Sequence, residues 1–126
     1  VILEQMLHDL NFSTKIVRCD IAREKDGLAM SSRNSYLSTD ERRKALCLYH
    51  SLLLARKLFS EGIRKASILK PHLKNLIESN DGVIDYIEFA DPSSLLSTED
   101  LFSETRVLLA VKIGKTRLID NMSLAE

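Results

Sequence analysis

The sequence is poor in the residues that build disulfide-stapled or metal-stabilised domains. It contains no tryptophan and only two cysteines, Cys19 and Cys47, in 126 residues. These cysteines are too few and too far apart for a zinc ribbon or a disulfide framework, and we expect two buried or unreactive thiols in a reducing cytosol. The three histidines lie on three separate segments without a carboxylate or cysteine at ligand spacing. A metal site built from the histidines is therefore not expected.

Net charge and long hydrophobic runs are missing as well. Eighteen Lys and Arg residues balance eighteen Asp and Glu residues, and aromatic residues make up 6% of the chain. This balance argues against a nucleic-acid-binding domain, because such domains usually present a basic surface. No stretch approaches the roughly 18 apolar residues that span a bilayer, and the N-terminus lacks the basic region of a signal peptide. We expect a cytoplasmic protein without nucleic-acid or membrane partners.

What the chain does contain is enough apolar residues, 44%, to form the core of one domain. It begins at Val1, without a methionine and within an apolar helical pattern, so we expect a piece of a longer protein. Residues 1–10 have the spacing of an amphipathic helix, and the β-branched run at residues 15–21 predicts a strand. This helix and strand predict a first unit, residues 1–22.

The remaining residues, 23–126, predict a second unit of the α+β class, with two helices packed on a three-stranded, mainly antiparallel sheet. Ser38 and Glu41 form a capping box that begins a helix ending at Gly62. Another helix covers about residues 64–79; because Pro71 lies inside it, the helix either bends there or begins later. Strands are predicted at the end of the chain, over residues 83–89, 105–113 and 116–122, with a type II′ turn at Gly114-Lys115.

The stretch from Arg23 to Asn34 is the candidate functional loop. It follows the predicted strand, and ligands of open α/β sheets bind beyond the carboxyl ends of strands. Gly27 allows a tight turn, Ser31 and Ser32 offer hydroxyl and backbone N–H donors, and Arg33 carries a fork suited to phosphate oxygens. This inventory is typical of an anion-binding loop, although a Ser-Ser-Arg sequence alone is more often a solvated turn.

The loop also carries a resemblance to a known family. The run Arg-Glu-x-Asp-Gly-Leu-Ala-Met-Ser-Ser-Arg-Asn-x-Tyr-Leu-Ser at residues 23–38 closely resembles pantothenate synthetases (pantoate–β-alanine ligases). Supporting segments occur elsewhere in the family's order: Asp9-Leu10-Asn11-Phe12, Asp85-Tyr86 and Gly114-x-Thr116-Arg117-Leu118-Ile119-Asp120-Asn121. The resemblance extends over essentially the whole chain.

The resemblance implies a two-domain nucleotidyltransferase that joins pantoate to β-alanine with ATP and Mg²⁺, through pantoyl adenylate, releasing pyrophosphate and AMP. Residues 1–22 then resemble the helix–strand remnant of a Rossmann-like domain, and residues 23–126 a C-terminal lid that covers ATP. No HIGH-like motif is present, and the pantoate-binding segments are missing. The resemblance therefore implies a missing N-terminal domain, a fragment that is inactive alone, and a parent enzyme that is a homodimer.

The family's site residues map onto the loop. The resemblance implies that Ser31, Ser32 and Arg33 contact the ATP phosphates and have the catalytic role of a KMSKS-type loop. Met30 belongs to the same nucleotide-binding set, and the backbone of Cys19 and Ala22 falls where the family contacts adenine. The family usually has Pro-Thr where this chain has Asp20-Ile21.

An alternative function and the role of two strand residues stay open. The chain could be a stand-alone α+β interaction module that binds no nucleotide, with its loop an ordinary connector. Within the second unit, we favour a structural role for Arg117 and Asp120, in pairing across the sheet or with the helices, over contact with a ligand.

Overall fold

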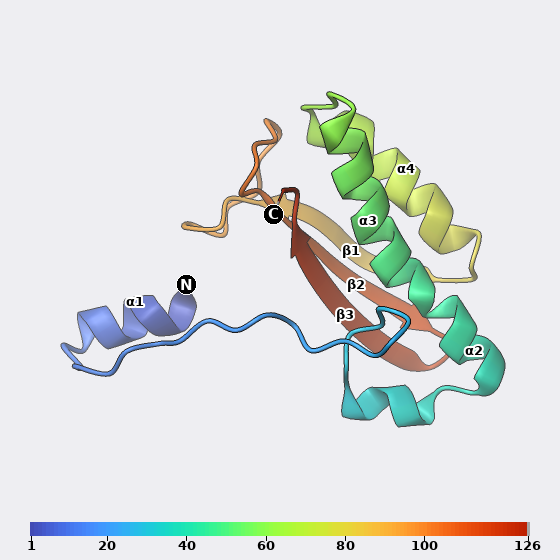
Figure 1. The fold of residues 1–126 in the computed structure, drawn as a ribbon, viewed down its shortest axis with the longest axis horizontal. Helices are drawn as coiled ribbons and strands as arrows, with labels where there is room; N and C mark the ends of the chain where they lie inside the picture. Colours follow the sequence, from blue (N-terminus) through green and yellow to red (C-terminus); the bar gives the residue numbers. More distant parts are fainter. Residues whose placement is uncertain (126) are drawn as a thin grey trace.

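The computed structural model describes residues 1–125 of the chain. The elements follow in the order α1 (Ile2–Asp9), a 3₁₀ helix (Ser32–Tyr36), α2 (Thr39–Lys44), α3 (Leu46–Ser60), α4 (Ala66–Glu78), β1 (Val83–Ala90), β2 (Arg106–Ile113) and β3 (Thr116–Ser123). Figure 1 shows α3 and α4 side by side against the sheet, whereas α1 lies apart at the end of a long connecting segment.

The sheet is antiparallel throughout, with the strand order β1-β2-β3. Gly114 in the turn between β2 and β3 has a φ of +57°, whereas Lys115 is not among the residues with positive φ. Positive φ at the first central residue alone is the type II′ arrangement, as the sequence predicts. An irregularity in register between Ile84 and Tyr86 forms a bulge in β1.

The core lies between the sheet and the pair of helices α3 and α4. Alternate residues of the strands face it because successive side chains of a strand point to opposite faces. The fully buried members include Leu48 and Leu52 from α3, Leu69, Leu73 and Ile77 from α4, and Val107, Leu109, Val111 and Ile113 from β2. The predicted fold class, two helices on a three-stranded antiparallel sheet, is confirmed.

The predicted ends of the first long helix are confirmed, but the helix is divided. Ser38 accepts from the backbone N–H of Glu41, whose side chain accepts from the N–H of Ser38, which completes the capping box of α2. A one-residue irregularity at Ala45 separates α2 from α3. Beyond α3, the N–H groups of Gly62 and Ile63 donate to the carbonyls of Phe59 and Leu58, in the Schellman pattern that a glycine with positive φ allows.

The second helix, α4, runs through Pro71 without interruption. Proline removes the bond to the carbonyl of Ser67 four residues earlier, which weakens the helix locally. The beginning of the helix is held from outside: Glu99 accepts from the backbone N–H of Ala66 through its carbonyl and from that of Ser67 through its carboxylate. The sequence left open whether this helix bends at Pro71 or begins only after it. Because α4 begins at Ala66, the later beginning is excluded.

The strand predicted over residues 15–21 is wrong. This segment belongs to no strand and connects α1 to the rest of the chain (Figure 1). A strand is stabilised by hydrogen bonds to a neighbouring strand, and none of the described residues offers one here. The predicted helix at residues 1–10 is present as α1, but none of its residues is buried, and Ile2 is 72% exposed. No described helix is long and apolar enough to span a bilayer.

Two adjacent leucines of α3 test the position of the core. Leu52 is fully buried, whereas Leu53 is 40% exposed. We expect Leu52→Ala to lower the free energy of unfolding by about 2–5 kcal/mol, because it removes packed methyl groups and leaves a cavity. Leu53→Ala, the matched control, should change it by about 0.5 kcal/mol or less. Urea unfolding of both variants measures the difference, and equal losses would contradict the assignment of the core.

Candidate functional site

The site is built on a small hairpin over residues 23–29. Arg23 and Ala29 face one another as a β-bridge, and the N–H of Glu24 donates to the carbonyl of Leu28 at 2.8 Å. Gly27 forms the turn with a φ of +97°, a conformation that glycine adopts at little cost. An added Cβ at Gly27 would lie 2.1 Å from the Tyr49 ring, so the hairpin is pressed against α3.

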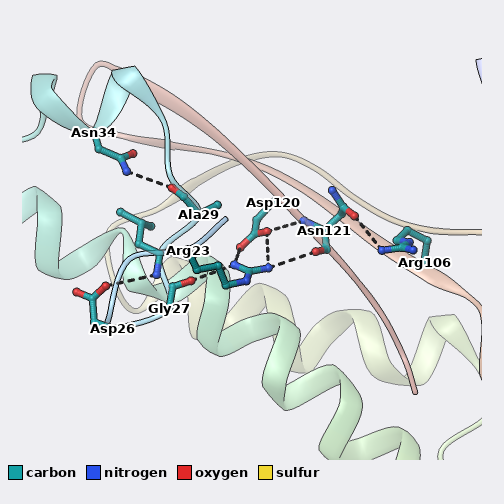
Figure 2. A network of polar contacts seen from close by, with 9 residues as sticks. Arg23, Asp26, Gly27, Ala29, Asn34, Arg106, Asp120 and Asn121 are labelled. Carbon is teal, nitrogen blue, oxygen red and sulfur yellow. Dashed lines mark hydrogen bonds and ion pairs between the residues drawn. The ribbon is translucent and has the colours of Figure 1, made fainter. Parts of the chain in front are cut away.

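The hairpin is joined to β3 by a buried ion pair. The Arg23 guanidinium donates to both carboxylate oxygens of Asp120, at 2.7 and 3.0 Å (Figure 2). The Asp120 side chain is 1% exposed. Arg23 also donates to the carbonyls of Gly27 and Asn121 and lies 4.8 Å from the centre of the Tyr49 ring. Because a bidentate, hydrogen-bonded pair satisfies both charges, Asp120 can be buried on the core side of the strand.

A second arginine holds the hairpin from the side of α2. Arg42 donates to the carboxylates of Glu24 at 2.8 Å and Asp26 at 2.9 Å. These bonds, followed for Glu24 by a bond from Asn34, lower the pKa of both carboxyls below their ordinary values. Because the pKa of each carboxyl is lowered in the folded state, these ion pairs stabilise the fold at pH values above the ordinary carboxyl pKa. This stabilisation is lost as the pH falls below that value. The carboxylates of Glu24 and Asp26 are therefore charged at neutral pH and stay paired with Arg42.

The Ser-Arg loop, residues 30–33, follows the hairpin and is held by hydrogen bonds at both of its ends. The N–H of Met30 donates to the carbonyl of Ala22 at 2.9 Å, and the amide of Asn34 donates to Glu24. The same amide donates to the carbonyl of Ala29 (Figure 2). Between these points, Ser31 caps the 3₁₀ helix by accepting from the N–H of Arg33.

The arginine of this loop differs from Arg23 and Arg42 in having no partner among residues 1–125. Arg33 is exposed, and its guanidinium makes no hydrogen bond or ion pair with any residue in the described part of the chain. Its fork is therefore available to an anion.

A hollow of about 340 Å³ lies between the loop and β3. Met30, Ser31 and Arg33 line one side, and Arg117 and Ile119 line the other. The remaining lining residues are Ile21, Leu28, Ala29, Asn34, Leu48, Leu118, Asp120 and Asn121. The walls thus combine apolar side chains, suited to a flat ring, with arginines suited to anionic oxygens.

The other predicted site residues lie near this hollow but do not line it. Ser32 begins the 3₁₀ helix and is exposed, and Ala22 lies at the base of the loop, where its carbonyl already accepts from Met30. Cys19 is a free, exposed thiol that lines a neighbouring hollow of about 610 Å³, together with Arg23 and Arg106. Cys47 is buried, which raises the pKa of its thiol to about 11 and keeps it protonated at neutral pH.

Sequence reasoning missed three supports of the loop, namely Arg23, Arg42 and the pairing of Asp120 with the hairpin. One signal could have found Asp120. It alternates with Leu118 and Met122 on the core side of β3, and a carboxylate in such a position needs a buried cationic partner. Arg117, on the opposite face, pairs with Asp85 across the sheet at 2.8 Å.

No group of three or more His, Cys, Asp or Glu residues that could hold a metal ion occurs among the described residues. Mg²⁺ commonly binds through substrate phosphates and only one or two carboxylates.

The fold and the site define a small α+β domain that presents an exposed serine–arginine loop beside a partly apolar hollow. A sequence profile of the pantoate-beta-alanine ligase family matches residues 1–123. The chain belongs to this family, which confirms the resemblance carried by residues 23–38.

Relatives and solved structures agree with this family. The pantothenate synthetase of Clostridium novyi is 49% identical over 121 residues, covering 95% of this chain and 43% of that protein. The crystal structure of pantothenate synthetase from Thermus thermophilus has a TM-score of 0.90 at 33% identity, covering 98% of this chain and 45% of the other. The pantoate-beta-alanine ligase of Francisella tularensis, complexed with β-γ ATP and β-alanine, has a TM-score of 0.66 at 30% identity, covering 97% and 38%. The chain thus spans less than half the length of these proteins.

Two glycines with similar backbones test the contact between the hairpin and α3. Gly27 and Gly62 have φ values of +97° and +103°, but an added Cβ meets the Tyr49 ring only at Gly27 and has no atom within 4 Å at Gly62. We expect Gly62→Ala to cost about 1–2 kcal/mol of unfolding free energy from backbone strain. Gly27→Ala should cost about 1–3 kcal/mol more, because the ring must move. Urea unfolding of both variants gives the comparison, and equal costs would show that Tyr49 does not press on the hairpin.

Proposed function

We propose that this chain is the C-terminal, ATP-covering part of a pantoate–β-alanine ligase. Residues 1–22 are then the end of its nucleotidyltransferase domain, and residues 23–126 are its lid. The observation that carries the proposal is the position of Arg33, which is exposed, lacks a partner in the described part of the chain and lines a partly apolar hollow, in a chain of this family. Family membership favours this function over that of a stand-alone interaction module.

In this proposal, Arg33 and the two serines bind the phosphates of ATP. The backbone N–H groups of Ser31 and Ser32 donate no hydrogen bond to any described residue, and both side chains are exposed. Two N–H donors, two hydroxyls and one guanidinium match the acceptor oxygens of a triphosphate. Their catalytic contribution is to offset charge that develops as the bond between the α-phosphorus and pyrophosphate breaks.

The adenine ring is proposed to lie against the inner end of the same loop. Met30 supplies an apolar surface for it. The carbonyl of Ala22 keeps one lone pair after accepting from Met30, which suits an amino-group donor. Cys19 contributes through its backbone, because its side chain lines the neighbouring hollow.

The complete reaction proposed here has two displacements. The carboxylate of pantoate attacks the α-phosphorus of ATP and pyrophosphate leaves, giving pantoyl adenylate. The amine of β-alanine then attacks the acyl carbon, loses a proton, and AMP leaves with the electrons of the broken acyl–oxygen bond. Mg²⁺ would accompany the nucleotide phosphates, and no step is assigned to it because no cluster of three or more metal-ligating side chains occurs among the described residues.

The proposal includes a larger assembly. The groups that bind pantoate are assigned to a domain N-terminal to this chain, which is expected to cover the exposed apolar residues of α1. The homodimer stays a prediction. Since this chain spans 43% of the C. novyi relative, we propose that it is inactive alone.

The test is a substitution in the complete ligase. We expect Arg33→Ala to lower kcat by roughly 10²–10³-fold, the loss typical of removing one donor to a developing negative charge. Arg43→Ala, whose arginine is 76% exposed and bonded to Asp40, serves as the control and should change kcat by less than about twofold. The assay measures AMP release from ATP in the presence of pantoate and β-alanine. Normal activity in Arg33→Ala would refute the phosphate role.

A further inference from the structure

The four residues Met30 to Arg33 are held at both ends by hydrogen bonds to residues 22–29. At one end, the N–H of Met30 donates to Ala22, which precedes the hairpin. At the other, the side-chain amide of Asn34 donates to Glu24 Oε1 at 2.9 Å and to the carbonyl of Ala29 at 3.1 Å. A displacement of the hairpin therefore displaces the whole loop.

Glu24 links this arrangement to α2. Its Oε1 accepts from Asn34, and its Oε2 accepts from Arg42, whose side chain is 23% exposed. A continuous line of charge-assisted hydrogen bonds thus runs from α2 through Glu24 to the residue directly after Arg33. On the opposite side, Arg23 joins the hairpin to Asp120 of β3.

We propose that Arg42 and Arg23 are positioning residues that set the place of Arg33, so that Arg42 acts on the reaction through Arg33 without contacting the nucleotide. The inference rests on the proposed function of the loop and adds residues that hold it. Arg33 has no described partner that could fix its guanidinium, so its place depends on the backbone that carries it. A misplacement of about 1 Å can lower a catalytic rate about 10²-fold.

A double-mutant cycle in the complete ligase tests this dependence. The variants are Arg42→Gln, Arg33→Ala and the double variant, with kcat and KM for ATP measured by pyrophosphate release in the presence of pantoate. We expect Arg42→Gln alone to lower kcat/KM by about 10-fold or more. In the Arg33→Ala background it should lower it by less than about twofold, because groups that act as a unit are not additive.

The control is Arg43→Gln, one residue further along α2, where the arginine bonds Asp40 and not the hairpin. It should leave kcat/KM within about twofold of the wild type in both backgrounds. A merely structural role of Arg42 would instead multiply the two losses in the double variant, since a reduced fraction of folded enzyme lowers activity whatever residue stands at position 33.

A milder substitution covers the case in which Arg42→Gln fails to fold, which thermal denaturation against Arg43→Gln reveals. Glu24→Gln keeps an oxygen for Asn34 but removes the charge that Arg42 binds, and it should show the same loss of effect in the Arg33→Ala background.

The outcomes separate the two claims. If Arg33→Ala lowers activity but Arg42→Gln acts in full in that background, the positioning role is wrong and the proposed function stands. If Arg42→Gln alone has no effect, the positioning role is likewise wrong. If Arg33→Ala itself leaves activity unchanged, the phosphate role of the loop fails, and the positioning role fails with it.

Discussion

The ion pair between Arg23 and Asp120 is the interaction on which the candidate site depends. It joins residues from opposite ends of the chain and fixes the hairpin to an edge strand of the sheet. Asp120 is 1% exposed, so removing Arg23 would leave a buried charge without a partner, a change that typically costs about 3–5 kcal/mol. The Arg23 guanidinium cannot move to another position at low cost, because it also donates to the carbonyls of Gly27 and Asn121 and lies over the Tyr49 ring.

This pair also explains how a loop made of residues that favour flexibility can be held in one position. Serine, glycine and exposed arginine favour flexible loops, but here they are held by β3 on one side and by α2, through Arg42, on the other. Of the arginines lining the hollow in the described part of the chain, Arg117 is paired with Asp85, whereas Arg33 is unpaired. In a chain without net charge, one local cation is thus left for an anionic ligand. The loop is thus hydrogen-bonded at both of its ends, at Met30 and at Asn34, and its arginine has no partner among the described residues.

Local sequence rules predicted much of this fold because the deciding interactions are local. The capping box at Ser38 and Glu41, the end of α3 at Gly62 and the turn at Gly114 each depend on residues within a few positions. The strand at residues 15–21 failed because strand formation needs a neighbour that none of the described residues provides. For the site, the motif indicated Met30, Ser31 and Arg33, which the hollow brings together. The ion pair was missed because Arg23 and Asp120 meet only through tertiary packing. The alternation of buried residues along β3 did indicate that Asp120 faces the core and needs a partner there.

The central claim is that the Arg23–Asp120 pair holds the loop in one place on the sheet. Backbone order parameters from ¹⁵N relaxation, compared between the wild type and Asp120→Asn, test it most directly, because they report motion within the folded state. The wild type should show order parameters near 0.85 over residues 23–34, about as high as in β2, and Asp120→Asn should lower them below about 0.6 in the loop alone. A loop that stays as ordered as the sheet in Asp120→Asn would contradict the account.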